Sequence, residues 1–313
     1  MQDVALIVNP VAGRGKTVSS LDRIERMARE AGLNYTILKT SYPGEATLLA
    51  RKAAEEGARV VAAVGGDGTV SEVGAGLVRT DAALAVIATG TGNDFARLIG
   101  VRRNLPLCVR TLRDGAERRI DVGRAGDRYF LNTLGIGFDG RVTYENRKIK
   151  TIRGMASYMV AVLRLLPTYR NPTFHLKTRD WEYSSKGVLI EVGNGSFAGG
   201  GFKLCPGADP HDGILDITFL GDYRPMQRWV ALPMVLMRQH QRLRRCRLFR
   251  CDLFKVSVSR PIYMHLDGNL HYLREPMTVE VLPAALKVLF PPGSAAPPVA
   301  IPPPEEPPGE AAV

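Results

Sequence analysis

A buried-strand pattern that ends in a glycine loop constrains this chain more than any other feature. Residues 60–64 are apolar and rich in valine, and Gly65-Gly66-Asp67-Gly68-Thr69 follows at once. Thr69 and Glu72 have the spacing of a capping box, which predicts a helix beginning near Thr69. A strand, a glycine turn and a helix N-terminus in succession let backbone N–H groups face an anion.

Asp67 lies inside this predicted anion-binding loop. A carboxylate would repel a bare phosphate, so its presence makes sense where a metal ion or a proton transfer stands between the two groups. Enzymes that transfer a phosphoryl group from a magnesium nucleotide have this requirement. The loop therefore favours phosphoryl-transfer chemistry.

Strand and helix patterns alternate through the first 120 residues. We expect strands at residues 4–9, 35–39, 60–64 and 84–88, and helices at residues 21–31, 46–56, from about 69, and 94–99. This order predicts an α/β fold, with a doubly wound parallel sheet covered by helices on both faces.

Strand patterns follow one another from about residue 119. They cover residues 120–124, 129–133, 174–178, 187–192, 215–220, 253–258 and 277–282, with helical insertions near 150–166 and 225–240. This half predicts an antiparallel β-sandwich or open barrel. We expect domains at residues 1–121 and 122–290, followed by a disordered tail at 291–313, which is rich in Pro, Ala and Glu.

Composition favours a cytoplasmic protein. No apolar run reaches the roughly 18 residues that span a bilayer, and the N-terminus shows no signal-peptide pattern. The four cysteines have neither a CxxC pair nor zinc-ligand spacing, which is typical of scattered intracellular thiols.

The net charge of +11 arises largely between Arg224 and Arg250. Two interpretations stay open: a solvated helix face with a loop, or a patch that meets an anionic membrane leaflet, where each basic residue contributes on the order of 1 kcal/mol. Few aromatic residues interleave with this charge and no recognition-module signature occurs, so we do not expect nucleic-acid binding.

A second glycine loop, Thr89-Gly90-Thr91-Gly92-Asn93-Asp94, follows the predicted strand at 84–88. Both glycine loops come at the carboxyl ends of parallel strands, where ligands bind in such sheets. We therefore expect Asp67 and Asp94 at one crevice, with Asp121 near the junction of the domains. The loop from Asn9 to Thr17 nearly matches a P-loop, but Pro10 stands where glycine is required.

Two further acidic turns occur in the second half. Asp209, Asp212 and Asp216 surround a turn whose oxygen ligands suit Mg²⁺ or Ca²⁺, although a plain Asp-Gly turn explains the pattern almost as well. Asp267-Gly268-Asn269 precedes the last strands and carries little weight as a lone turn.

These segments together resemble the diacylglycerol kinase catalytic-domain family, in particular the bacterial soluble lipid kinases and the sphingosine and ceramide kinases. The resemblance spans roughly residues 4–290 in family order. It rests on Asn9-Pro10 with Gly13, Gly44-Glu45-Ala46, Gly65-Gly66-Asp67-Gly68-Thr69, Gly90-Thr91-Gly92-Asn93-Asp94-Phe95-Ala96, Ile120-Asp121-Val122-Gly123, Tyr129-Phe130-Leu131-Asn132, Gly135-Ile136-Gly137-Phe138, Asp212-Gly213-Ile214-Leu215-Asp216 and Asp267-Gly268.

The resemblance implies ATP and Mg²⁺ as cofactors, with ATP between an N-terminal nucleotide domain and a C-terminal lipid-binding sandwich. It implies ATP contacts at Asn9, Thr40, Gly65, Gly66, Asp67, Gly68, Thr69, Val70, Ser71 and Thr91. It also implies a water and magnesium network around Asp67, Asp94 and Asp121. A structural Mg²⁺ is implied near Asp212 and the backbone of Ile214, with Asp209 as a further candidate.

Asn269 departs from the family pattern, which places a glutamate there as the base for the lipid hydroxyl proton. An amide cannot accept that proton, and general-base help contributes roughly 10²–10⁴-fold to rate. We predict catalytic roles for Asp67, Asp267 and the position of Asn269, with Asp267 or His271 as a substitute base.

The resulting prediction is a lipid kinase that phosphorylates diacylglycerol or a similar lipid and visits the membrane surface, with a homodimer as an open possibility. A catalytically weak relative that senses nucleotide and lipid is the alternative, favoured by Asn269. An NAD kinase is a third interpretation, which shares only the Gly65–Thr69 loop.

Overall fold

The computed structural model describes residues 3–101, 104–149, 151–152 and 154–294. Most of the predicted disordered tail, residues 295–313, lies outside the described residues. The elements of the first half are β1 (Val4–Val8), η1 (Ala12–Gly15), α1 (Lys16–Glu30), β2 (Tyr35–Lys39), α2 (Glu45–Glu55), β3 (Val60–Gly65), α3 (Asp67–Leu77), β4 (Ala83–Ala88), α4 (Asp94–Leu98) and α5 (Leu105–Asp114).

The elements of the second half are mainly strands. They are β5 (Ala116–Ala125), β6 (Arg128–Phe130), β7 (Thr133–Gly137), α6 (Phe138–Asn146), α7 (Met155–Leu165), β8 (Thr173–Lys177), β9 (Glu182–Gly193), β10 (Leu215–Gly221), α8 (Pro225–Leu236), η2 (His240–Arg242), β11 (Cys246–Cys251), β12 (Leu253–Val258), β13 (Ile262–Leu266), β14 (Asn269–Leu273) and β15 (Met277–Phe290).

A parallel sheet in the order β2-β1-β3-β4 forms the N-terminal core. Every residue of β1 and β3 is buried, because α1 with α5 and α2 with α3 cover the sheet. Strands buried on both faces read as continuous apolar runs, which is why the sequence pattern located them. The predicted doubly wound α/β fold is confirmed.

Antiparallel strands form the C-terminal half as two packed sheets. One contains β8, β12, β15, β5 and β6, and the other has the order β14-β13-β7-β9-β10-β11. The long strand β9 takes part in both, since its first residues pair with β8 and its last with β7 and β10. The aromatic side chains of Phe130, Phe174, Phe219 and Phe254 fill the core between the sheets. The predicted β-sandwich is confirmed.

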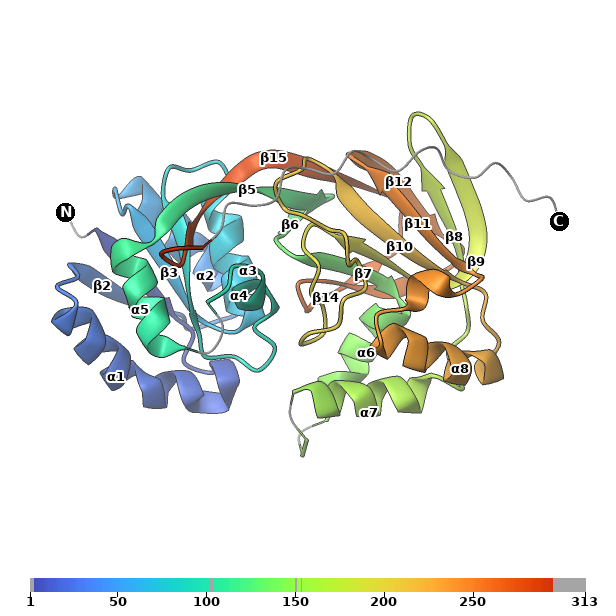
Figure 1. Ribbon diagram of the computed structural model, residues 1–313, viewed down its shortest axis with the longest axis horizontal. Helices are drawn as coiled ribbons and strands as arrows, with labels where there is room; N and C mark the ends of the chain where they lie inside the picture. Colours follow the sequence, from blue (N-terminus) through green and yellow to red (C-terminus); the bar gives the residue numbers. More distant parts are fainter. Residues whose placement is uncertain (1–2, 102–103, 150, 153, 295–313) are drawn as a thin grey trace.

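Two long strands connect the halves, as Figure 1 shows at the top of the molecule. β5 and β15 pair antiparallel along most of their lengths, and the end of β15 pairs parallel with β4. Leu286 and Val288 of β15 pack into the N-terminal core, while Val279 packs into the sandwich core. The last strand therefore ties the two cores together.

Helices α6, α7 and α8 lie together below the sandwich in Figure 1. Their apolar residues form a third cluster with Val188 and Leu189 of β9 and Leu220 of β10. None of the helices in the described residues is long and apolar enough to span a membrane.

The structure corrects several local predictions. Helix α3 begins at Asp67 rather than near Thr69, and no side chain caps it. The capping box does not form at Thr69, because its hydroxyl lies in the first turn and accepts a hydrogen bond from the Asn9 side chain at 3.0 Å. The basic segment predicted as a helix face or loop contains strand β11, which pairs with β10.

Candidate active site

The two glycine loops lie side by side, as their places in the parallel sheet predict. β3 and β4 are neighbours, and a β-carbon on Gly90 would lie 2.3 Å from the Cα of Gly66. No side chain fits at that approach, so glycine is required there. The contact brings the Asp67 carboxylate onto the backbone of the second loop, where it accepts the N–H groups of Asn93 and Asp94, each at 2.6 Å.

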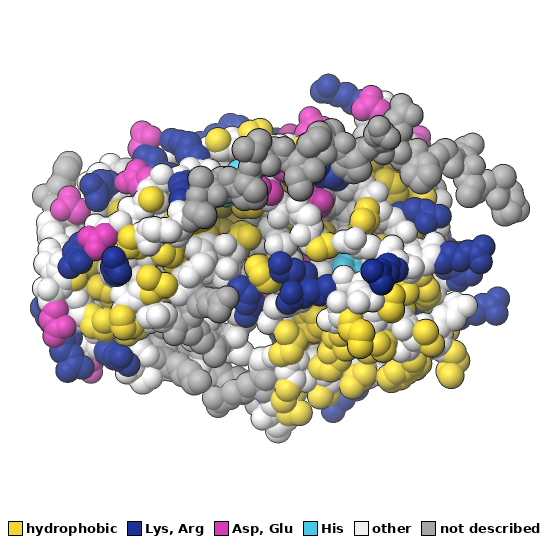
Figure 2. Space-filling view, in the orientation of Figure 1, with side chains coloured by type: hydrophobic (Ala, Val, Ile, Leu, Met, Phe, Trp, Pro, Cys, Tyr) yellow, Lys and Arg dark blue, Asp and Glu magenta, His cyan; other side chains and the backbone are white. Residues whose placement is uncertain are grey.

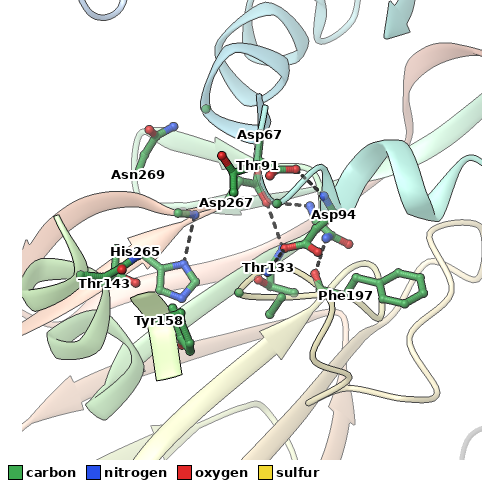
Figure 3. Close-up of a pocket in the computed structure, with 18 of the residues that line it drawn as sticks. Asp67, Thr91, Asp94, Thr133, Thr143, Tyr158, Phe197, His265, Asp267 and Asn269 are labelled. Atoms are coloured by element: carbon green, nitrogen blue, oxygen red, sulfur yellow. Dashed lines mark hydrogen bonds between the residues drawn. The ribbon is translucent and has the colours of Figure 1, made fainter. Parts of the chain in front are cut away.

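These loops form one wall of a cleft of about 410 Å³ between the two halves of the molecule. The opposite wall comes from the β6–β7 connection, the β13–β14 turn and the loop that carries Gly200. Figure 3 shows Asp67, Thr91 and Asp94 facing Asp267 across it. The predicted site residues that line the cleft are Asp67, Gly68, Val70, Ser71, Thr91, Asp94, Asp267 and Asn269.

Burial and mutual repulsion perturb the two carboxylates of the first wall. Burial and the nearby Asp94 charge raise the pKa of Asp67 to about 6, against the opposing effect of its N–H partners. Burial also raises the pKa of Asp94, whose two oxygens accept from Gly200 N and Arg97 Nη1. Asp67 Oδ1 also accepts the N–H of Phe95 at 3.3 Å, while Asp67 Oδ2 and the two Asp94 oxygens each accept one of the hydrogen bonds described. These three oxygens fit a hard cation such as Mg²⁺ that completes its shell with water.

Asp267 anchors the opposite wall. Its carboxylate accepts the backbone N–H groups of Leu131, Asn132 and Thr133 at 2.7, 2.9 and 3.0 Å. It occupies a left-handed conformation with φ 47°, at a turn that places Asn269 opposite the first glycine loop. A β-carbon on Gly68 would lie 3.3 Å from Asn269 Oδ1, so position 269 faces the predicted phosphate loop.

Other predicted nucleotide contacts lie outside the lining of the cleft. The side-chain amide of Asn9 donates a hydrogen bond to the Thr69 hydroxyl. Thr40 follows β2, and its N–H donates to the carbonyl oxygen of Val8. Gly65 is buried and Gly66 is half-buried. None of Asn9, Thr40, Gly65, Gly66 and Thr69 is among the described residues that form the cleft wall.

Asp121 lies with the second acidic turn, not with Asp67 and Asp94. Its oxygens accept the N–H groups of Gly213 and Ala284, each at 2.7 Å, and its charge contributes to raising the pKa of Asp212, where burial is the main cause. The sequence order could not show this, because Asp121 sits on β5, which faces the turn only after the sandwich has formed.

The second acidic turn contains its own cation. The Arg250 guanidinium forms an ion pair with Asp212 and lies 3.4 Å from the Asp216 carboxylate. The Asp209 carboxylate contacts Nδ1 of His211 at 2.8 Å. Burial raises the pKa of Asp216 to about 6 despite Arg250. The N–H of Ile214 bonds to Asp212 Oδ1 at 3.0 Å. Three carboxylates against one arginine leave negative charge that fits a divalent cation.

Sequence reasoning missed a buried group beside the cleft. His265 on β13 lines it, and its ring contacts Asp139 of α6 with Glu191 of β9 close by. A signal existed for His265, because it lies only two residues before Asp267, near the end of the strand that leads into the Asp267 turn. Asp139 and Glu191 are 126 and 74 residues away from His265 in sequence and gave no local signal.

The comparisons agree with this architecture. Residues 3–125 match the diacylglycerol kinase catalytic domain, and residues 132–290 match the YegS C-terminal NAD kinase beta sandwich-like domain. A diacylglycerol kinase of Bacillus subtilis is 30% identical over 273 residues, covering 86% of this chain and 90% of that protein. A Pseudomonas aeruginosa protein named as a probable lipid kinase, YegS-like, is 31% identical over 288 residues, covering 90% and 91%.

A solved structure shares the fold over most of both chains. The crystal structure of a diacylglycerol kinase from Bacillus anthracis str. Sterne superposes with a TM-score of 0.70, at 24% identity, and covers 93% of this chain and 97% of that one. With the cleft, the paired glycine loops and both family matches in place, the chain belongs to the diacylglycerol kinase and YegS-like family of lipid kinases.

Proposed function

We propose that this protein transfers the γ-phosphoryl group of ATP, with Mg²⁺, to the free hydroxyl of diacylglycerol or a closely similar lipid. One observation carries the proposal: Asp67 and Asp94, at the ends of neighbouring strands, face the Asp267–Asn269 turn across a single cleft. Phosphoryl transfer needs phosphate-binding backbone, oxygen ligands for a cation and a second wall that positions the acceptor.

The chain's own groups divide these tasks. Gly68 lies in the first turn of α3, whose N-terminus favours the negative charge of a phosphate. Asp67 and Asp94 are held by backbone N–H groups, so they need little reorganisation to bind a cation. When bound, Mg²⁺ would offset the charge that develops on the transferring phosphoryl group. Asp121 stabilises the neighbouring acidic turn at Asp209, Asp212 and Ile214, which is the candidate for a structural cation.

An apolar pocket beside the cleft supports a lipid acceptor. It has a volume of about 80 Å³ and lies between α7, α8 and the outer face of the second sheet. Tyr158 and Ala198 line both this pocket and the cleft, so the two share a wall. The pocket is small for a whole acyl chain, so a chain would enter by parting α7 from α8. The members of its wall include Phe138, Val162, Leu189, Leu220, Leu232 and Val235.

The surface over α8 supports contact with a membrane. Met226, Val230 and Met237 are 78%, 74% and 67% exposed, and Trp229 is 42% exposed. Figure 2 shows apolar side chains gathered at the lower right, where Figure 1 places α7 and α8. The next segment carries exposed arginines that suit an anionic leaflet, namely Arg238, Arg242, Arg244, Arg245 and Arg247.

The test is a kinase assay with radiolabelled ATP and diacylglycerol in mixed micelles, with a panel of other hydroxyl-bearing lipids and NAD beside it. We expect a lipid phosphate that depends on Mg²⁺ and is lost in Asp67→Ala. The matched control Asp81→Ala removes an exposed carboxylate far from the cleft and should retain activity. Labelled NAD without labelled lipid would contradict the proposal.

A catalytically weak nucleotide and lipid sensor is the second candidate. The observation that favours it is Asn269, an amide at the position that faces the phosphate loop. ATP binding measured by calorimetry without product from any lipid in the panel would favour the sensor over the kinase.

A further inference from the structure

Four residues form a buried polar cluster behind the acceptor wall. In the second sheet, Glu191 of β9, Gly135 of β7 and His265 of β13 are cross-strand neighbours on one face. Gly135 leaves the space into which Asp139 of α6 projects. A β-carbon there would lie 2.4 Å from His265 Nε2, 2.7 Å from Asp139 Oδ2 and 2.8 Å from Glu191 Oε2. Strand register and one glycine thus bring three titratable side chains together.

Hydrogen bonds define the tautomer of His265. In the neutral imidazole, Gly268 N–H points at Nδ1 from 3.3 Å, so Nδ1 is the unprotonated nitrogen, and Nε2–H is donated to Asp139 Oδ2 at 2.5 Å. The arrangement is therefore that of a carboxylate orienting a histidine whose second nitrogen is a free base.

The pair also spans the wall between the two cavities. His265 lines the cleft together with Asp267 and Asn269, while Asp139 lines the apolar pocket. A lipid whose chain occupied the pocket and whose hydroxyl reached the cleft would pass this wall. The contact of Gly268 N–H with Nδ1 is long and weak at 3.3 Å, so a hydroxyl group can replace it.

The two bases expected from the sequence are poorly placed for the same task. Asp267 uses its carboxylate to hold three backbone N–H groups. Burial and the nearby positive charges of Arg128 and Arg147 lower the pKa of His271 to about 4, which makes it a weak base. Asn269 has no basic atom at all.

We propose, on the basis of the proposed kinase function, that His265 accepts the proton of the lipid hydroxyl and that Asp139 orients it. The hydroxyl O–H bond breaks, and its proton passes to His265 Nδ1. The oxygen forms a bond to the γ-phosphorus of ATP, and the bond from that phosphorus to the bridging oxygen breaks, releasing ADP. The imidazolium is stabilised by Asp139 until its proton returns to solvent through the cleft.

The groups facing His265 set the pH at which it can act. They are Asp139 of α6, Glu191 of β9, Asp267 of the turn and His271 of β14. Burial alone would lower the pKa of His265, but the charges of Asp139, Glu191 and Asp267 outweigh it and raise the pKa to about 9. Burial and Asp139 also raise the pKa of Glu191. The free base of His265 is therefore scarce at pH 7 and grows as the pH rises.

The experiment measures kcat, KM for ATP and metal content across pH 6.5–9.5. It uses the full chain as wild type, His265→Gln, Asn269→Glu and the double variant His265→Gln/Asn269→Glu. Gln can keep the contact with Asp139 but has no basic atom. We expect His265→Gln to lower kcat about 10²–10⁴-fold with an unchanged KM for ATP. The carboxylate of the double variant should restore kcat to within about tenfold of wild type.

The wild-type pH profile gives a readout that does not depend on a variant folding. We expect kcat to rise about tenfold from pH 7 to 8 and to begin levelling only above pH 9, whereas the double variant should be flat over this range. A flat wild-type profile, His265→Gln with more than a third of wild-type kcat, a folded double variant without recovery, or a stoichiometric transition metal lost in His265→Gln would each overturn the assignment. Absence of lipid phosphate from both wild type and Asn269→Glu would instead refute the proposed function.

Discussion

The carboxylate of Asp67 accepts the backbone N–H of Asp94 at 2.6 Å, so one acidic residue fixes the start of the helix that carries the other. The two side chains repel each other, and the charge of Asp94 adds to burial in raising the pKa of Asp67. A bound cation would offset the repulsion between these two carboxylates, which supports the proposed magnesium site.

Replacing Asp67 by Asn should test the role of its negative charge without changing the size of the side chain. Asn keeps the size and one acceptor oxygen for the N–H groups of the second loop, but it cannot bind a cation as a carboxylate does. We expect kcat for lipid phosphorylation to fall about 10²–10³-fold, measured in the micelle assay at saturating Mg²⁺. A variant within threefold of wild type would remove Asp67 from the magnesium network.

Stability should depend on pH through the same group. The folded-state pKa of Asp67 is about 6, above its ordinary value of 3.8. Its contribution to stability is therefore fully present below about pH 4 and is lost as the pH rises through 6. The difference corresponds to about 3 kcal/mol. In urea titrations, the gap in the free energy of unfolding between wild type and Asp67→Asn should change by up to this amount between pH 4 and pH 7, with wild type losing stability relative to the variant as the pH rises. A gap of the same size at both pH values would contradict the assignment.

Gly90→Ala tests the close approach of the two glycine loops. Its methyl group would lie 2.3 Å from Gly66 Cα, where only backbone can give way. We expect a loss of about 1–3 kcal/mol in the free energy of unfolding together with a higher KM for ATP. Gly32→Ala is the control, since Gly32 has φ 70° but open space around it. It should cost about 1 kcal/mol and leave KM unchanged.

How far sequence alone could predict the site depended on where each residue's partners lie. The Gly65–Thr69 and Thr89–Asp94 loops follow neighbouring strands, so local patterns placed them together. Asp121 was expected beside Asp67 and Asp94, but its carboxylate binds the N–H of Gly213 in the second acidic turn. Gly213 is 92 residues away in sequence, so no local pattern could show this contact. His265 went unnoticed for the same reason. Its partner Asp139 lies on a helix that sequence patterns did not locate.

The fold shows the same limit. Strands buried on both faces, such as β3, gave strong signals, whereas β11 carries Arg247 and Arg250 and has an irregular burial pattern. β13 and β14 flank the Asp267–Gly268 turn and were also not predicted. These two segments are strands because they pair with each other and because β13 pairs with β7, and their composition alone does not predict this.

Arg250→Met tests the second acidic turn. Removing the guanidinium leaves Asp212 and Asp216 without their cation, and breaking a buried ion pair typically costs about 3–5 kcal/mol. We expect a lower Tm in EDTA and a partial recovery in millimolar Mg²⁺, larger than any effect of Mg²⁺ on wild type. If Mg²⁺ raises the Tm of neither the variant nor the wild type, no cation binds at this turn.

Membrane contact through α8 is tested by Met226→Ser/Val230→Ser. Both side chains are exposed, so the free energy of unfolding should change by less than about 0.5 kcal/mol. Co-sedimentation with anionic phosphatidylglycerol vesicles should fall severalfold, and with it the rate on vesicle-borne lipid, while the rate on detergent-dispersed lipid stays the same. The control Val18→Ser/Leu48→Ser removes two exposed apolar side chains from α1 and α2, on the other half of the molecule, and should leave vesicle binding intact. If both double variants bind vesicles as wild type does, the protein reaches its lipid through another surface.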